Sequence, residues 1–111
     1  MLYTIKNEKL LVEICDKGAE IKRINFLGEE RFFDSNPKYW DRSAPLLWPC
    51  IGAIKDKYAI FDNDKYPITR HGILRDIMFN VVSQKSEYIR LELYSNEDSE
   101  IFLFGKILKN E

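Results

Sequence analysis

The single histidine of the 111-residue chain, His71, lies in a stretch rich in groups that bind ligands or transfer protons. Residues 66–76 read YPITRHGILRD, so Arg70 precedes this histidine directly and Arg75 follows it by four positions. An imidazole with an ordinary pKa of about 6.5 exchanges protons near neutral pH. Guanidinium groups donate planar sets of hydrogen bonds to hydroxyls, carboxylates or phosphates. Gly72 allows the backbone to turn sharply beside a ligand. The stretch therefore predicts a site for a ligand that carries such oxygen groups.

The same residues also have a plainer explanation. A lone histidine is more often a surface residue or a hydrogen-bonded member of a core, and the arginines are consistent with ordinary solvated charge. Arg75, for example, is followed by Asp76, with which it can form an ion pair. Taken alone, the stretch leaves both interpretations open.

Composition excludes several classes of function. A net charge of -1 argues against a nucleic-acid-binding face, which needs concentrated positive charge. No run of about 18 apolar residues is present, so no membrane span is expected, and the first residues show no secretory signal. Cys15 and Cys50 are isolated thiols, and one histidine makes a structural zinc site improbable. We expect a reduced cytoplasmic protein without a metal.

The apolar residues alternate with a period of two, which is typical of strands rather than helices. Strands are predicted around residues 10–15, 79–83 and 88–94, and residues 58–68 read as a hairpin with turn formers at 62–64. This pattern predicts an all-β fold, an antiparallel β-sandwich forming one domain over residues 1–111. Six side chains are expected to face a common core: Leu10, Val12, Ile14, Ile89, Leu91 and Leu93.

The middle of the chain has a different character. Asn36 and Pro37 are suited to the N-cap and first position of a single helical turn. Residues 43–52 are apolar but contain two prolines, which bars them from a central strand. Such a segment usually packs as a buried connection, so the side chains of Leu46, Leu47 and Trp48 are expected to fill a core.

Three ordered motifs resemble one known family. Residues 36–52 match NPxYWxRxAPxLxPxxG, residues 55–58 read KDKY, and residues 66–76 match YPxxRHGxxRD. Together they are similar to the aldose 1-epimerase (galactose mutarotase-like) family, and most of all to its LacX-type branch. The similarity extends from about Leu2 to Ser95, and matched spacing over some 40 residues is far more specific than one His-Gly pair.

The resemblance implies the N-terminal portion of a β-supersandwich that binds a sugar or sugar phosphate in an open cleft. The family interconverts α and β anomers without a metal or organic cofactor: a carboxylate base deprotonates the anomeric hydroxyl while a histidine acid protonates the ring oxygen. His71 matches the first of two family histidines, which orients the sugar. Arg75 matches an arginine suited to sugar hydroxyls or a phosphate. Arg70 and Trp48 are the further candidates for substrate binding, the tryptophan (or Tyr66) as an apolar wall.

Two departures from the family pattern limit the expected activity. The second histidine and the glutamate base lie further along family chains, beyond the residues that correspond to this sequence. Ala53 also stands where relatives commonly carry an arginine that lines the sugar site. We therefore expect family membership with little or no turnover by this chain alone. The alternatives are a non-catalytic carbohydrate-binding or structural β module, and an inactive fragment stabilised by self-association through an exposed sheet edge.

Overall fold

The computed structural model describes residues 1–61 and 63–94, which form two compact units. The first, here called the sheet unit, comprises Met1–Leu46 and Arg75–Glu92. The second, the loop unit, comprises Leu47–Leu74 together with the described residues 93 and 94. The fold is all-β with antiparallel sheets, as the alternating apolar pattern predicts. That the whole chain forms one domain stays a prediction.

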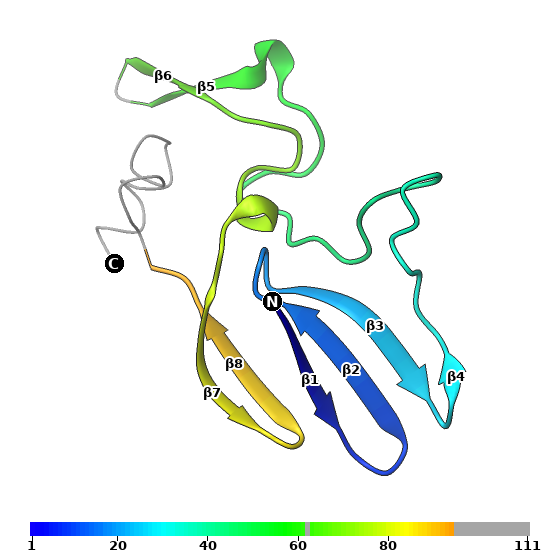
Figure 1. Cartoon of the computed structure of the whole chain (residues 1–111). Coiled ribbons are helices and arrows are strands. Elements are labelled where there is room, and N and C mark those ends of the chain that lie inside the picture. The colour runs from blue at the N-terminus through cyan, green and yellow to red at the C-terminus, as the bar shows by residue number, and fades with distance from the viewer. Residues whose placement is uncertain (62, 95–111) are drawn as a thin grey trace. The chain divides into compact units, whose positions relative to one another are not determined.

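Four antiparallel strands in sequence order make the main sheet of the sheet unit (Figure 1). They are β1 (Leu2–Lys6), β2 (Leu10–Cys15), β3 (Glu20–Phe26) and the short β4 (Glu29–Glu30). The predicted strand at residues 10–15 is confirmed as β2. An irregularity in the β2–β3 register lies between Glu13 and Ile14 and inserts one extra residue into β3.

A hairpin lies beside β1 in the same unit (Figure 1). It consists of β7 (Asn80–Lys85) and β8 (Tyr88–Glu92), which confirms the strands predicted at residues 79–83 and 88–94. The amide of Lys6 donates to the carbonyl of Ser86 at 2.7 Å, and Gln84 Nε2 donates to the carbonyl of Thr4 at 3.1 Å. These two hydrogen bonds connect the hairpin to the edge of the four-stranded sheet.

The two faces of the main sheet differ in chemistry, because successive side chains of a strand point to opposite sides. On one side Arg23 bridges Glu13 and Glu30, and the hydrogen bond from Arg23 lowers the pKa of the Glu30 carboxyl below its ordinary value. The strand register places only uncharged, mainly aliphatic side chains on the other side, here called the apolar face. Its members are Tyr3, Ile5, Leu10, Val12, Ile14, Ile21, Ile24 and Phe26.

The predicted common core is wrong for the described part of the chain. Of the six residues expected to form it, Ile14 alone is buried, whereas Leu10 is 40% exposed. Val12, Ile89, Leu91 and Leu93 are half-buried. The alternation along the strands is as predicted, but an apolar sheet face becomes a core only when a second layer covers it. Most side chains of the apolar face remain partly exposed in the described structure.

A buried carboxylate holds the middle of the chain against β3. Glu20 is 1% exposed and accepts hydrogen bonds from the amide of Ser43 at 2.7 Å and the amide of Ala44 at 3.1 Å. The Ser43 hydroxyl and the Lys22 ammonium also contact it. Burial raises the pKa of Glu20, but these donors together outweigh it and leave the pKa below its ordinary value. The carboxylate therefore stays ionised and anchors residues 43–44.

The connection around residues 36–52 is partly as expected. Asn36 caps a single helical turn, since its side-chain oxygen accepts from the amide of Lys38 at 3.0 Å. Leu46 and Leu47, by contrast, are each 40% exposed, so their predicted role as core filler is wrong. Trp48 is half-buried. The sequence argument took apolarity as a sign of burial, but both leucines keep a large exposed area in the described structure.

The loop unit is built around a hairpin of β5 (Tyr58–Phe61) and β6 (Asp64–Pro67), as predicted for residues 58–68. A 3-10 turn, η1 (Lys55–Lys57), precedes it, and a second, η2 (Leu74–Asp76), begins at the end of the unit. Tyr66, Ile68 and Ile73 form its small buried core.

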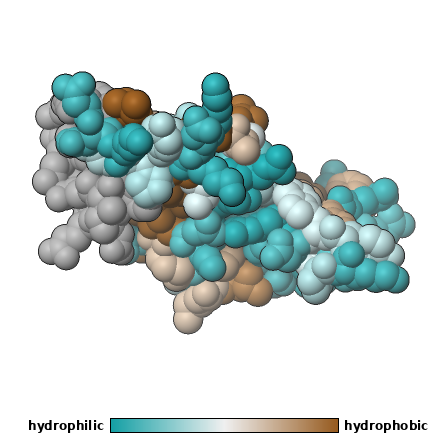
Figure 2. Space-filling view, turned by 90° about the horizontal axis from the view of Figure 1, so that it is seen from above, coloured by the Kyte–Doolittle hydropathy of each residue, from teal (hydrophilic) through white to brown (hydrophobic). Residues whose placement is uncertain are grey.

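Figure 2 shows apolar residues reaching the surface as brown patches among polar teal ones. No helix in the described part of the chain has the length and apolarity needed to cross a membrane.

Glu20→Gln is predicted to destabilise the protein at neutral pH. The glutamine side chain carries no charge, and its own N–H groups would face the amide donors of residues 43–44. The free energy of unfolding is therefore expected to fall by about 1.5–3 kcal/mol. Since the folded pKa of Glu20 is lowered, its stabilisation is present above its ordinary pKa of 4.5 and is lost as the pH falls through the folded value.

Urea unfolding followed by circular dichroism at pH 7 and pH 3 measures this effect. The difference in stability between Glu20→Gln and the parent should be smaller at pH 3 than at pH 7. Glu30→Gln is the control, because that carboxylate is exposed, and it should change stability little. Equal losses for the two variants at pH 7 would contradict the anchoring role of Glu20.

Candidate functional site

The His-Gly pair forms the tip of a tight turn in the loop unit. Its two residues both have left-handed backbone angles, with φ of 66° at His71 and 82° at Gly72. The amide of Gly72 donates to the carbonyl of Thr69 at 2.9 Å, and the Thr69 hydroxyl donates to the carbonyl of Gly72 at 2.9 Å. A left-handed histidine is uncommon, and its presence indicates that surrounding contacts determine the conformation.

Those contacts come from the proline-containing segment of residues 48–52. The amide of Trp48 donates to the carbonyl of His71 at 3.2 Å, and the amide of Ile73 donates to the carbonyl of Trp48 at 3.1 Å. The amide of His71 in turn donates to the carbonyl of Gly52 at 2.9 Å. Two segments about 20 residues apart are thus held together by three backbone hydrogen bonds, and the histidine lies where they meet.

Gly72 is required for this close approach. A Cβ atom built at this position would lie 1.9 Å from the carbonyl oxygen of Trp48 and 2.8 Å from Cδ of Pro49. The nearest atoms belong to backbone and to a rigid ring, so they cannot move aside as a flexible side chain would. The left-handed backbone and the absence of a side chain both call for glycine here.

The imidazole of His71 is oriented by a backbone donor. The amide of Gly52 donates to His71 Nδ1 at 2.7 Å. Because Nδ1 accepts this hydrogen bond, the neutral ring carries its proton on Nε2. The half-buried side chain therefore offers an N–H donor at Nε2. A ligand oxygen is a suitable acceptor for such a group.

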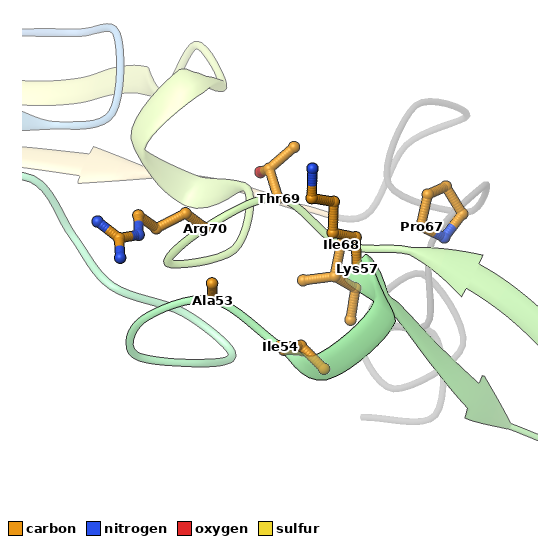
Figure 3. Close-up of a pocket in the computed structure, with 7 residues that line it drawn as sticks. All are labelled: Ala53, Ile54, Lys57, Pro67, Ile68, Thr69 and Arg70. Carbon is orange, nitrogen blue, oxygen red and sulfur yellow. The ribbon is translucent and has the colours of Figure 1, made fainter.

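A pocket of about 490 Å³ flanks the turn (Figure 3). Ile68 at its lining is buried, whereas the cationic side chains of Lys57 and Arg70 are exposed. Figure 3 shows the Arg70 side chain on one side of the small Ala53 methyl, with Lys57 and Ile68 on the other. The full lining is Ala53, Ile54, Lys57, Pro67, Ile68, Thr69 and Arg70.

This arrangement suits a ligand that combines an apolar face with oxygen acceptors. The aliphatic lining can contact C–H groups, and the two cations can bind hydroxyls or an anion. Ala53 follows Gly52 and Arg70 precedes His71, so the pocket adjoins the oriented imidazole along the chain. No carboxylate is among the residues that line the pocket.

The sequence candidates divide between the two units. Arg70, His71 and Trp48 all lie in the loop unit, with Arg70 lining the pocket and Trp48 bonded through its backbone to the turn. Arg75 belongs to the sheet unit, where its carbonyl accepts from Arg42 Nη1 at 3.0 Å. Its Nε lies 4.0 Å from Asp76 Oδ2. That His71 and Arg75 face one cleft stays a prediction.

Sequence reasoning missed three features of the site. Thr69 closes the turn, the amide of Gly52 orients the imidazole, and Ile54 and Ile68 supply the apolar lining. Gly52 lies within the quoted motif, but its contact with a residue 19 positions away is a tertiary one. Among the described residues, no group of three or more His, Cys, Asp or Glu is placed to hold a metal ion.

Solved proteins of one fold class, the galactose mutarotase-like proteins, share the fold of this chain. A galactose mutarotase related enzyme from Lactobacillus acidophilus matches 92% of this chain with a TM-score of 0.88 and 34% identity, and the match covers 35% of that chain. A galactose mutarotase-like protein from Lactobacillus casei ATCC 334 matches 89% with a TM-score of 0.84 and 26% identity, over 34% of that chain. The fold is therefore the N-terminal portion of a galactose mutarotase-like structure.

The sequence comparisons agree with the fold. The family model for aldose 1-epimerase matches residues 1–105, so the chain belongs to the aldose 1-epimerase family. Protein LacX of Lactococcus lactis subsp. lactis, in its plasmid and chromosomal forms, is 27% identical over 104 residues. The alignment covers 88% of this chain and 35% of each relative. The chain thus spans about a third of the length of the relatives it matches.

Gly72→Ala is predicted to disrupt the crossing of residues 48–52 and 69–73. Any L-residue in a left-handed conformation costs about 1–2 kcal/mol, and here the new methyl group also overlaps a carbonyl oxygen. A total loss of about 3 kcal/mol or more is expected, at the upper end of single substitutions. Thermal melting measures the loss, and hydrogen exchange of the Trp48 and Ile73 amides locates it.

Gly28→Ala is the matched control. Gly28 has a similar φ of 86°, but a Cβ atom there meets nothing within 4 Å. The Gly28→Ala variant has the cost of a left-handed alanine without an overlap of its methyl group with other atoms. It should therefore lower stability less than Gly72→Ala does and leave the Trp48 and Ile73 amides protected from hydrogen exchange. Similar melting points and similar amide protection in both variants would show that the close approach at Gly72 does not matter.

Proposed function

We propose that this chain provides the His-Gly wall of a sugar site and binds a hexose or hexose phosphate. The observation that carries the proposal is the hydrogen bond from the Gly52 amide to His71 Nδ1, which leaves Nε2–H as a donor on the residue that follows Arg70 of the pocket. A pre-oriented donor loses little freedom on binding, so it can select an acceptor by position. Family membership supports a sugar as the ligand.

The pocket residues divide the recognition of such a ligand. Ile54 and Ile68 would contact the C–H face of the ring, as the apolar lining of sugar sites does. Nε2 of His71 would donate to a ring or hydroxyl oxygen. Arg70 and Lys57 would bind a phosphate or outer hydroxyls, since both side chains are exposed cations at the same pocket. In this proposal Trp48 serves as an apolar wall and Arg75 as a further sugar contact.

The reaction that fits is the interconversion of sugar anomers. A base takes the proton from the anomeric hydroxyl while an acid delivers one to the ring oxygen, and rotation followed by reclosure gives the other anomer. One imidazole supplies at most one of these roles, and no carboxylate lines the pocket. In this proposal His71 orients the sugar, as the resemblance to the family implies, and turnover needs an acid and a base from elsewhere in the fold.

A non-catalytic carbohydrate-binding role is the second candidate. It is favoured by Ala53, because this residue lines the pocket with a methyl group that cannot donate a hydrogen bond to a ligand. The two free thiols, Cys15 and Cys50, are consistent with a reducing compartment, so the proposed location is the cytoplasm. Both candidates place the same ligand class at the same pocket, and an activity assay separates them.

His71→Asn is predicted to weaken sugar binding without unfolding the turn. The asparagine side-chain oxygen can replace Nδ1 as the acceptor for the Gly52 amide, and asparagine tolerates a left-handed backbone. It cannot replace Nε2–H, so binding should weaken about 2- to 10-fold, the range of one neutral hydrogen bond. NMR titrations with glucose and glucose 6-phosphate measure the affinity, and melting points check the fold.

Arg70→Ala is the accompanying control for ligand chemistry. It should weaken binding of glucose 6-phosphate more than binding of glucose. Parent-like affinity for both ligands in His71→Asn would remove the imidazole from the proposed site.

The chain alone is predicted to give little or no acceleration of mutarotation. Loss of a general acid or base removes about 10²–10⁴-fold in rate each, and uncatalysed exchange in water proceeds in the background. Polarimetry on freshly dissolved α-glucose and α-galactose tests this directly. A protein-dependent acceleration that His71→Ala abolishes would show that this chain holds a complete catalytic set.

A further inference from the structure

Gly52 is bonded to His71 through both of its backbone polar groups. Its amide donates to His71 Nδ1 at 2.7 Å, and its carbonyl accepts from the amide of His71 at 2.9 Å. The first of these hydrogen bonds exists only while Nδ1 carries no proton, because a protonated imidazole is a donor at both nitrogens. Protonation of the ring would therefore set the N–H of Nδ1 against the N–H of Gly52.

The charged groups around the turn give an imidazolium no counter-charge. Arg70, the one charged residue of the 69–73 segment, is itself a cation, and residues 48–52 contain no charged residue, with Cys50 as their one titratable group. The other charged residues described in the loop unit are Lys55, Asp56, Lys57, Asp64 and Lys65. In the described part of the chain no carboxylate forms an ion pair with His71. A proton on the ring is therefore not offset by a partner.

Gly52 is suited to move when its amide loses the acceptor. It has a left-handed φ of 81°, and a Cβ atom built on it would meet nothing within 4 Å, so the space beside it is open. Glycine reaches other backbone conformations without the steric limits of a side chain. The two remaining backbone hydrogen bonds of the crossing are made by Trp48 and involve no imidazole nitrogen. Gly52 can thus separate from the turn while the contact at Trp48 remains.

Movement of Gly52 would act directly on the pocket. The next two residues, Ala53 and Ile54, both line it, and Figure 3 shows them on the loop that enters the 3-10 turn η1. A ligand in the pocket would lose contact with these two side chains if the loop moved away. The protonation state of one ring is thereby connected to one wall of the pocket.

We propose that Gly52 and His71 form a pH-sensitive switch, in which protonation of the imidazole releases residues 52–54 from the His-Gly turn and opens the pocket wall. The closed form has no proton on Nδ1, whereas the open form accepts one. The closed form is therefore fully favoured above the ordinary imidazole range and loses population as the pH falls through about 6.5 and below it. Uptake of one proton shifts the equilibrium at most about tenfold per pH unit, and so up to about thirtyfold at pH 5.

The switch as such rests on the Gly52–His71 hydrogen bond and not on sugar binding. Its effect on a ligand does rest on the proposed function, which places a sugar in the pocket that Ala53 and Ile54 line. The two claims are therefore measured separately, by amide exchange and by ligand affinity.

Amide hydrogen exchange followed by NMR at about pH 7.5 and about pH 5 tests the switch. After correction for the intrinsic pH dependence of exchange, protection of the Gly52 and His71 amides should fall about 10- to 30-fold at the lower pH. The Trp48 and Ile73 amides should keep their protection within about twofold. The carboxylate of Glu20 stays ionised at pH 5, because its pKa lies below the ordinary value of 4.5, so its anchor does not contribute to the change.

His71→Asn is the matched control, because its side-chain oxygen can accept from the Gly52 amide but does not titrate. Protection of the Gly52 amide in this variant should agree within about twofold at the two pH values. A Gly52 amide that stays equally protected at pH 5 in the parent would overturn the proposal. So would an equal loss in His71→Asn, or a loss shared by the Trp48 and Ile73 amides, because opening would then not depend on the ring or would extend to the whole crossing.

Glucose affinity is the separate readout, measured by NMR titration at the same two pH values. Glucose is the probe because it does not titrate in this range, whereas a phosphate monoester changes charge near pH 6. Its affinity for the parent should fall in parallel with the protection of the Gly52 amide and should stay constant in His71→Asn. Loss of Gly52 protection with unchanged glucose affinity would support the switch and count against a sugar site at this pocket.

Discussion

The contact between Gly72 and the carbonyl of Trp48 is the constraint on which the candidate site depends. With no side chain at position 72, the turn approaches the other segment closely enough for hydrogen bonds between their backbones. That approach brings the amide of Gly52 to the imidazole of His71 and so determines which nitrogen carries the proton. The site is therefore a product of backbone packing, and its one titratable ring takes its orientation from main-chain groups.

The sheet unit is stabilised by different means. Exposed ion pairs cross the strands on its polar face, and the buried carboxylate of Glu20 anchors a chain segment to β3. Its apolar face contributes less than it would in a closed sandwich, because most of its side chains remain partly exposed.

Much of the fold was predictable from local pattern. Alternation predicted β2 and β8, the short run at residues 79–83 predicted β7 as a separate strand, and the turn formers after residue 61 predicted the β5–β6 hairpin. The strand β3 was missed because an extra residue within it places Ile21 and Ile24 three positions apart, which breaks the period of two. The core was predicted wrongly because alternation gives the face of a side chain and not what covers that face.

The site was predictable only in part. The His-Gly pair drew attention to His71, and Arg70 at the pocket followed from its position in the same motif. The donor from Gly52 and the apolar lining arise from contacts between segments distant in sequence, which spacing alone does not reveal. Arg75 was grouped with His71 because both match one family motif; the structure assigns Arg75 to the sheet unit and His71 to the loop unit, and their sharing of one cleft stays a prediction.

The orientation of the His71 ring is the central claim, and long-range ¹H–¹⁵N NMR of the imidazole tests it most directly. The chain has one histidine, so the signals need no assignment. At about pH 9, where imidazoles are generally neutral, a proton on Nε2 and an unprotonated Nδ1 that is coupled through its hydrogen bond to the Gly52 amide are predicted. A proton on Nδ1, or rapid averaging of the two tautomers, would contradict the account.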